Sequence, residues 1–359
     1  MRAYFFRVIA AAAVYLTMHF AVCLYMPSLI TAGYWVREMI VVKRALADTS
    51  PSPRIIVLGG SSALFGIDAR QVSAETGVFT MNMGLHAAMR MDRLLGIGVE
   101  MAYPGDIFVL NLEHVFYGCD EALWTDWQIR NMLAWDRVYF NGLPLRSRME
   151  GIFVAGGPGL SIDLLAGKIG SSLMPQHYVD RSDALEPAAV VFARYRSGKS
   201  RTSSFSYSAY NIDDHGDILN NHGTRFKGPG VPATMPGPVC PAIAGILSSF
   251  VHELKEKGAR AVVTHTPYLL DGAPDPDWQD AEQTFLRDMA SIGLEVVDHR
   301  EELFFPRESF FNTNLHLNED GRRERTKLFI NDLRRLGIGK NAGEMPATGS
   351  EPASPLQVK

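Results

Sequence analysis

The stretch 54-RIIVLGGSSALFGID-68 places four apolar strand-forming residues directly before two glycines and two serines. Residues 55–58 predict a buried β-strand, and Asp68 predicts the start of a short helix that ends at Gly77. Serine closes turns routinely, so Ser61 and Ser62 have a structural explanation. They also have a chemical one, because a hydroxyl group at the end of a strand can act as a nucleophile.

The composition fits one large globular domain that has no affinity for nucleic acid. Hydrophobic residues make up 47% of the 359-residue chain, which is enough apolar material for a sizeable core. The net charge of −4 and the lack of a long basic run exclude the strongly basic character that is usual in nucleic-acid-binding proteins. Cys119 and Cys240 are the two cysteines outside the apolar N-terminal run, and the sequence leaves open whether they pair.

The N-terminal region predicts a membrane anchor over residues 1–34. Residues 8–36 contain no charged side chain, and about 20 apolar residues are enough to span a bilayer as a helix. A cleaved signal peptide is the alternative, but its apolar region is usually about 7–15 residues long, which is shorter than this run. Arg2 and Arg7 favour a cytoplasmic N-terminus. We therefore expect a single-pass protein of the inner (cytoplasmic) membrane whose main domain is periplasmic.

The region 54–338 predicts a single α/β domain. Further strands are expected at 78–83, 106–112, 259–267 and 294–299. Helical patterns alternate with them at 87–103, 241–258, 276–292 and 318–337. This alternation predicts a three-layer, doubly wound parallel sheet. Residues 35–53 are expected to form a membrane-proximal helix and linker, and residues 339–359 a disordered tail.

A large insertion at about 117–239 interrupts the alternation. Its first half predicts helices and contains Trp124, Trp127 and Trp135, which fit either a core or a surface that stacks on sugar rings. Insertions at this place commonly form a lid or an acceptor groove. The polar segment 213-DDHGDILNNHG-223 has no spacing typical of a metal site, so we expect a solvated loop and neither a metal nor a cofactor.

Polar residues follow each expected strand, where a doubly wound sheet binds its ligands. They are Ser61–Ser62, then 82-NMG-84, 111-NLEH-114, 264-THTP-267 and the final loop 312-NTNLHLNEDG-321. A hydroxyl group, a backbone donor at a glycine and a histidine are the components that acyl transfer requires.

Three of these segments resemble the motifs of the SGNH (GDSL-type) hydrolase superfamily, whose fold is flavodoxin-like. The segment 59-GGSSALFG-66 is similar to the first motif, with Ser62 at the nucleophile and Ser61 in place of an aspartate. The segment at Asn82 resembles the second motif, in which the glycine, here Gly84, supplies an oxyanion-hole amide. The final loop resembles the last motif, with His316 as the catalytic base.

The chain departs from the superfamily pattern at two positions. The third motif usually contains an Asn-Asp pair, whereas Glu113 and His114 occupy that strand end and are expected to be structural or to contact the substrate. The last motif usually has an aspartate before the histidine. In the membrane-anchored branch the aspartate position corresponds to Asn312, which can orient an imidazole but cannot stabilise its charge. Asp298 is the alternative partner of the histidine.

The resemblance implies a membrane-anchored enzyme that transfers an acyl group, by analogy an acetyl group, through an acyl-serine to a surface or secreted polysaccharide. The acyl donor would come from a multi-spanning membrane acyltransferase. A carbohydrate or lipid esterase (deacetylase) of the same fold is an alternative. A non-catalytic scaffold or glycan-binding partner of such an acyltransferase is another, and it would need neither Ser62 nor His316.

Overall fold

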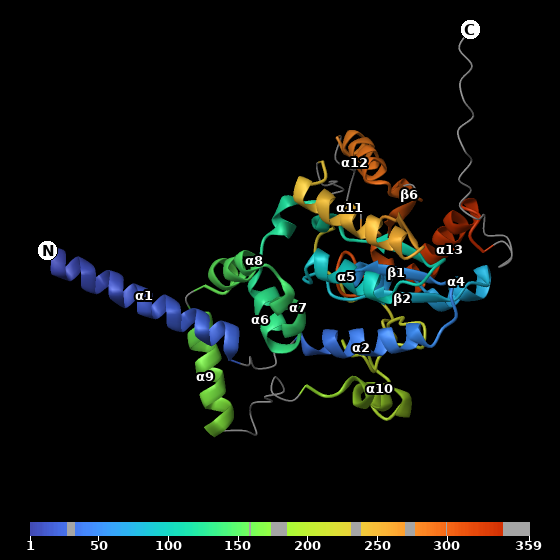
Figure 1. Ribbon diagram of the computed structural model, residues 1–359. Helices are drawn as coiled ribbons and strands as arrows, with labels where there is room; N and C mark the ends of the chain where they lie inside the picture. The colour runs from blue at the N-terminus through green and yellow to red at the C-terminus, as the bar shows by residue number, and fades with distance from the viewer. Residues whose placement is uncertain are drawn as a thin grey trace, which may run out of the picture.

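The chain forms a five-stranded parallel sheet in a computed structural model that describes residues 1–26, 33–157, 159–173, 185–230, 238–269, 277–298 and 300–339. The strands are β1 (Ile55–Gly59), β2 (Thr80–Gly84), β3 (Ile107–Asn111), β4 (Arg260–Val263) and β6 (Glu295–Val296), in the order β2-β1-β3-β4-β6 (Figure 1). This is the strand order of flavodoxin-like doubly wound sheets. The expected α/β fold with a central parallel sheet is confirmed.

Alternate side chains of the strands enter two different cores, as a sheet covered on both faces requires. Ile56 and Leu58 pack in a core with residues of α2 (Tyr34–Asp48), α5 (Met91–Met101) and α11 (Pro241–Glu256). Ile55 and Val57 pack in the other core with residues of α4 (Ala69–Thr76) and α13 (Glu319–Arg335). Since α2 contributes to the first core, the membrane-proximal segment is part of the α/β domain.

The helix predicted after the first strand begins and ends at the expected residues. The Asp68 side chain accepts a hydrogen bond from the backbone N–H of Gln71 at the start of α4, and Gly77 ends the helix in the left-handed conformation (φ 74°). No sequence pattern indicates the preceding helix α3 (Ser61–Gly66), which starts immediately after β1. The fifth sheet strand is shorter than expected, and a separate two-stranded pair joins β5 (Tyr268–Leu269) to β7 (Phe304–Phe305).

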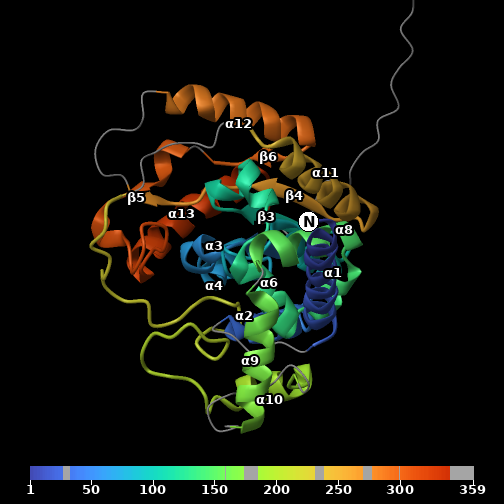
Figure 2. The same cartoon turned by 90° about the vertical axis from the view of Figure 1, so that its left-hand side faces the viewer.

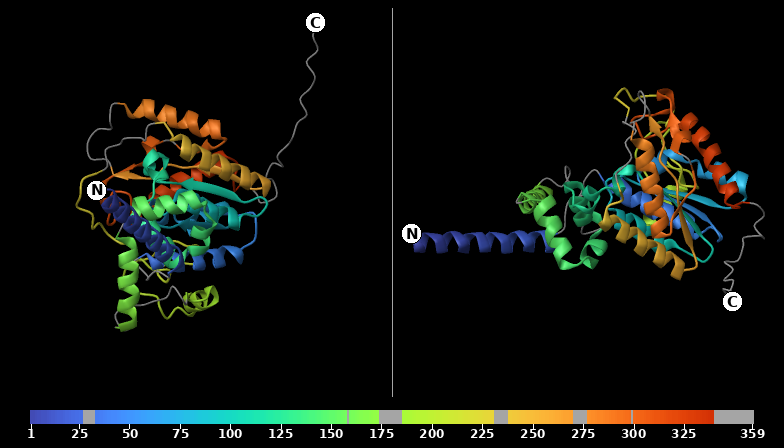
Figure 3. Two further views of the ribbon diagram at one scale, coloured as in Figure 1. Left: turned by 60° about the vertical axis from the view of Figure 1, so that its left-hand side comes forward. Right: turned by 90° about the horizontal axis from the view of Figure 1, so that it is seen from above.

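Helix α1 (Arg2–Tyr25) projects away from the rest of the chain (Figures 1 and 3). It is long and apolar enough to cross a membrane. Signal sequences share this length and apolar composition. The expected tail lies outside the described residues from residue 340 onward.

The insertion forms helices first and an extended segment later, as expected. Its helices are α6 (Asp126–Trp135), α7 (Arg137–Gly142), α8 (Leu145–Glu150), α9 (Leu160–Leu173) and α10 (Ala188–Ser197), the last of which lies beside α2 (Figure 2). Helix α12 (Trp278–Ile292) follows α11 and β4, and short helical turns occur at Gly151–Ala155, His114–Tyr117, Cys119–Ala122, Arg300–Leu303 and Arg307–Ser309. A disulfide joins Cys119 to Cys240, so the two cysteines left open by the sequence do pair.

The polar half of the insertion is more than a solvated loop. Ala209, Ile212 and Ile218 are fully buried in the core shared with the sheet. The backbone N–H of Asn82 in β2 donates to the carbonyl oxygen of His215 at 2.8 Å, so this segment lies along the edge strand. Its acidic residues pair with protein groups, since Arg70 forms ion pairs with Asp213 and Asp214.

Candidate functional site

Ser62 lies in the first turn of α3, which begins directly after β1 at the carboxyl edge of the sheet. A side chain at Gly59 would place a Cβ atom 2.0 Å from the carbonyl oxygen of Asn111, so the close approach of β1 to β3 requires glycine there. The Ser62 side chain is completely buried, and its hydroxyl forms no hydrogen bond with the described residues. Buried hydroxyl groups usually have a partner, so this one calls for a functional explanation.

The carboxyl group of Glu113 lies directly against the same turn. Its Oε1 atom accepts a hydrogen bond from the backbone N–H of Ser62 at 2.7 Å and a longer one from the Ser61 hydroxyl at 3.4 Å. A Cβ atom at Gly60 would lie 2.5–2.6 Å from the carboxylate oxygens, so glycine makes room for them. The Ser62 amide, which could otherwise serve as an oxyanion donor, is therefore already bonded to Glu113.

Glu113 is itself buried, and desolvation raises its pKa. Backbone N–H groups near Ser62 and Gly60 act in the opposite direction and lower the pKa, as does the Ser62 hydroxyl. That hydroxyl is close enough to affect the carboxylate, but the two groups form no hydrogen bond in this structure. The second carboxylate oxygen, Oε2, has no partner in the described part of the chain. Glu113 is thus poised to hold a proton more readily than an exposed glutamate.

His316 lies against the same helix as Ser62. Its ring stacks on Phe65, with centroids 4.3 Å apart and planes inclined by 4°. Phe65 follows Ser62 by three residues, which places the two side chains on neighbouring parts of the α3 surface. The expected hydrogen bond between Ser62 and His316 is not formed in this state, since the Ser62 hydroxyl has no partner among the described residues.

Asn312, and not Asp298, contacts the imidazole of His316. Asn312 Oδ1 lies 2.8 Å from His316 Nδ1, and the Asn312 amide nitrogen donates to the Tyr207 hydroxyl at 3.0 Å. An oxygen acceptor at Nδ1 places the imidazole proton on Nδ1 and leaves Nε2 as the acceptor. Burial, with a smaller effect of His86, lowers the pKa of His316 to about 3, so the ring is neutral at physiological pH.

Asp298 belongs to a separate buried network at the ends of β4 and β6. It lies 2.8 Å from His265 Nδ1 and 3.1 Å from a guanidinium nitrogen of Arg325. Burial opposes charge on His265, but Asp298 and Glu282 outweigh it and raise the pKa of His265 to about 9. Burial also opposes charge on Asp298, but mainly His265 lowers its pKa to about 2. This network is held by ion pairs, so His265 is protonated and is a poor base.

Gly84 and Asn82 hold β2 against α3. The backbone N–H of Gly84 donates to Asn82 Oδ1 at 2.9 Å, and the amide nitrogen of Asn82 donates to Ala63 and Ile67 carbonyl oxygens of that helix region. A Cβ atom at Gly84 would lie 2.2 Å from the Leu64 nitrogen, so glycine permits the close contact. The Gly84 amide is bonded to Asn82 and is not free to bind an oxyanion in this state.

A buried lysine supports Gly84 from the opposite direction, and sequence reasoning did not find it. Lys43 of α2 donates to the Gly84 carbonyl oxygen at 2.7 Å. Burial lowers the pKa of Lys43 to about 7, although the charges of Asp217 and Asp213 act to raise it. Asp217 in turn accepts a hydrogen bond from the Asn82 amide at 3.1 Å. In the sequence, Lys43 is one charged residue in an amphipathic helical pattern, so nothing in that pattern predicts its complete burial.

Aromatic side chains from separate parts of the chain lie near His316, since Tyr207 bonds to its partner Asn312 and His86 lowers its pKa. His86 stacks on Trp127 of α6 with ring centroids 4.6 Å apart, and Trp35 of α2 contacts both His86 and Tyr207. Trp124 and Trp135, by contrast, are buried. We call His86, Trp127, Trp35 and Tyr207 the aromatic group. Its members come from separate regions of the sequence, which is why the sequence alone indicates only Trp127.

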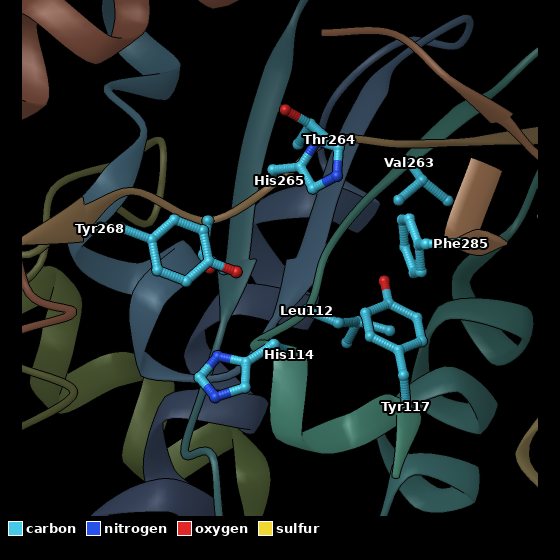
Figure 4. Close-up of a pocket in the computed structure, with 9 residues that line it drawn as sticks. Leu112, His114, Tyr117, Val263, Thr264, His265, Tyr268 and Phe285 are labelled. Carbon is cyan, nitrogen blue, oxygen red and sulfur yellow. The ribbon is translucent and has the colours of Figure 1, made fainter. Parts of the chain in front are cut away.

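A small pocket adjoins the ends of β3 and β4 (Figure 4). Its volume is about 10 Å³, close to the smallest space that holds one water molecule. His114, Tyr117, His265 and Tyr268 surround it, and the Tyr117 hydroxyl and His114 Nδ1 form no hydrogen bonds with described residues. The cavity is too small for an acyl group. Nor do the described ranges contain any cluster of three or more His, Cys, Asp or Glu side chains that could hold a metal ion.

No protein-family model and no curated protein matches this chain. Its function must therefore be inferred from the residues and their geometry.

Proposed function

We propose that this protein is an SGNH-like enzyme that forms an acyl-serine at Ser62 and transfers the acyl group to a polysaccharide. The observation that carries the proposal is a buried serine hydroxyl without a described hydrogen-bond partner, one helical turn from a phenylalanine on which a neutral histidine stacks. The position at the carboxyl edge of the sheet is where doubly wound proteins bind ligands.

The reaction begins when Ser62 Oγ attacks the carbonyl carbon of an acyl ester or thioester. Nε2 of His316 takes the serine proton, and Asn312 holds the ring through Nδ1. The carbon–oxygen or carbon–sulfur bond to the leaving group then breaks, and the histidine returns its proton to that group. A sugar hydroxyl next attacks the acyl-serine, with His316 accepting its proton and restoring Ser62.

The tetrahedral intermediate needs donors for its oxyanion. The Ser62 amide is one, provided that the Glu113 carboxyl moves aside or becomes protonated and shares it. The Gly84 amide becomes a second donor only if Asn82 releases it. Each adjustment changes one side chain, Glu113 after β3 or Asn82 in β2, and substrate binding would supply the energy for it.

The acceptor would bind to the aromatic group beside His316. Faces of tryptophan and tyrosine suit sugar rings, and Trp127 and Tyr207 are partly exposed. The disulfide between Cys119 and Cys240 supports the periplasmic location, because disulfides persist in oxidising compartments. The acyl donor would be supplied by a multi-spanning acyltransferase in the same membrane.

A non-catalytic, glycan-binding scaffold is the second candidate function. It is favoured by one observation: the amides of Ser62 and Gly84 are both bonded to side chains, and an asparagine stands beside the histidine. An esterase of the same fold would use the same acyl-serine and pass it to water.

Labelling with a fluorophosphonate, followed by intact-protein mass measurement, tests the proposal. We expect one adduct on the parent chain and on Ser61→Ala, and none on Ser62→Ala. Ser61→Ala is the matched control because it removes the neighbouring hydroxyl and leaves the nucleophile. An unlabelled parent, or an adduct that persists in Ser62→Ala, would exclude the catalytic role of Ser62 and leave the scaffold.

A further inference from the structure

Helix α9 carries an apolar stripe that no described part of the chain covers. Its exposed apolar residues are Ile162, Leu165, Ala166, Ile169 and Leu173. Their spacing of three, four, seven and eleven residues from Ile162 places them on one side of the helix. We call these five residues the α9 stripe. The opposite side of α9, with Leu160 and Leu164, is buried.

The packed side of α9 contacts the C-terminal part of α1. His19 Nδ1 lies 2.8 Å from the Ser161 hydroxyl, and Phe20 packs edge-on against Phe153, with centroids 4.5 Å apart. Cys23 of α1 shares a buried cluster with residues of α6 and α9. The helix that is apolar enough to span a bilayer is thus joined directly to the helix that bears the stripe.

A cation marks the end of α1. Arg137 donates a hydrogen bond to the Leu24 carbonyl oxygen at 2.8 Å and another to the carbonyl oxygen of Met26. A guanidinium group at a helix C-terminus complements the helix dipole. In a membrane, arginine places its charged group in the headgroup layer and its apolar stem toward the lipid chains. His19 precedes Tyr25 by six residues, so α9 starts about 9 Å from the end of α1 along its axis.

Helix α9 runs across the end of α1, and not alongside it, in both Figure 1 and Figure 3. If α1 crosses the bilayer, α9 therefore lies roughly in the plane of its surface. Amphipathic helices there bury their apolar face about 5–10 Å into the boundary between headgroups and acyl chains. Exposed Phe153 and Val154, next to the same end of α1, extend the apolar surface.

We infer that α9 is an interfacial helix whose stripe is embedded in the outer part of the same bilayer that α1 crosses. The occupant of this surface is lipid. An embedded α9 stripe would fix the distance between the aromatic group and the membrane surface. This is because α6 packs in the same cluster as α9 and also contributes Trp127 to the aromatic group. The inference does not depend on the activity proposed for Ser62.

Nitroxide depth measurement in the full chain, reconstituted in phospholipid vesicles, tests this inference. Single labels are placed at Ile169→Cys in the stripe, at Ala11→Cys in the middle of α1, and at Ser248→Cys on the exposed side of α11 as the control. The parent chain shows how much label the buried Cys23 takes up. Collision with oxygen, which concentrates in lipid, is compared with collision with a water-soluble nickel chelate.

We expect labels at residues 11 and 169 to collide severalfold more with oxygen than with nickel, and the label at residue 248 to show the reverse. A label at 169 that resembles 248, while the label at 11 is in lipid, would overturn the inference. A label at 11 in water would remove the anchor and the interfacial helix together. A second series at Ile162, Leu165 and Asp163 guards against a perturbed variant. Asp163 is exposed and lies about 100° around the helix from Ile162, so labels at the apolar pair must lie deeper than a label at Asp163.

Discussion

The imidazole ring of His316 lies flat on the ring of Phe65, with centroids 4.3 Å apart. Stacking fixes the plane of the imidazole, and the contact between Nδ1 and Asn312 fixes its rotation within that plane. The histidine is therefore oriented by groups from two segments more than 200 residues apart in the sequence, since Phe65 belongs to α3 and Asn312 to the final loop. The ring is held in this orientation without a hydrogen bond to Ser62.

Replacing Asn312 by aspartate should raise both the pKa of His316 and the rate of acyl-serine formation. A carboxylate beside Nδ1 stabilises the imidazolium that forms when the ring accepts the serine proton, which asparagine cannot do. The pKa of His316, about 3 in the parent, should move toward the ordinary histidine range. Histidine NMR titration and the rate of fluorophosphonate labelling measure the two effects. Asn314→Asp, on the same loop, is the control for an added charge and should change neither.

Replacing Glu113 by glutamine should accelerate labelling of Ser62 at neutral pH. The glutamine side chain would keep an oxygen acceptor for the Ser62 amide, but it removes a negative charge from the place where an oxyanion develops. For the same reason the parent should react faster as the pH falls through the raised pKa of Glu113. His316 stays neutral in this range, so it does not oppose the rise. A parent rate that falls with the pH, or a slower glutamine variant, would show that the carboxylate assists the reaction.

Replacing Asp298 by asparagine should destabilise the fold by about 3–5 kcal/mol, because it leaves His265 and Arg325 buried without their counter-charge. The pH dependence has a definite sign. The raised pKa of His265 stabilises the fold fully below about 6.5, and this stabilisation disappears as the pH rises through about 9. The lowered pKa of Asp298 adds stability above about 3.8 that is lost as the pH falls toward 2.

Urea unfolding at several pH values measures these changes. The parent should lose stability between pH 6.5 and 9, and the Asp298→Asn variant should show a smaller loss over that range. Asp120→Asn removes an exposed carboxylate and is the control, with an expected change below about 0.5 kcal/mol. Equal slopes in the parent and the Asp298→Asn variant would mean that the two side chains do not titrate together.

Replacing Trp127 by alanine should reduce transfer to polysaccharide more than labelling of Ser62 by a small reagent. The acceptor must be held close to the acyl-serine to compete with water, whereas the small reagent needs only Ser62, His316 and the oxyanion donors. Trp278→Ala, which removes a partly buried tryptophan from α12, is the control. Mass measurement of the acylated polymer and of the labelled protein separates the two steps. If both fall equally, Trp127 supports the fold around Ser62 and does not bind the acceptor.

Deleting the polar half of the insertion cannot test acceptor binding, because the deletion would also remove part of the core. The composition predicts a solvated loop at 213–223, yet Ile218 within it and Ile212 just before it are buried, and the loop bonds to the edge strand β2. The acidic residues of this segment form ion pairs with Arg70. Its polar composition therefore does not reveal that the few apolar residues between them are buried.

Periodic patterns in the sequence are sufficient to predict the sheet. Continuous apolar runs at 55–58 and 107–110 fit strands covered on both faces, and Asp68 and Gly77 mark the ends of α4 because their side-chain and backbone properties are local. The contact between Asn312 and His316 is also predictable, since both lie on one short loop. Local rules could not reveal the bond from Glu113 to the Ser62 amide or from Lys43 to Gly84, which depend on how distant segments pack.

The bridge between Cys119 and Cys240 has a consequence for the chain as a whole. Strands β1 to β3 precede it and strands β4 and β6 follow it, so the covalent link joins the two halves of the sheet at the entry and exit of the insertion. A protease that cuts anywhere between these cysteines would leave both halves in one molecule until the bridge is reduced. The insertion is thus a segment whose continuity the sheet does not need, and new termini could be opened within it.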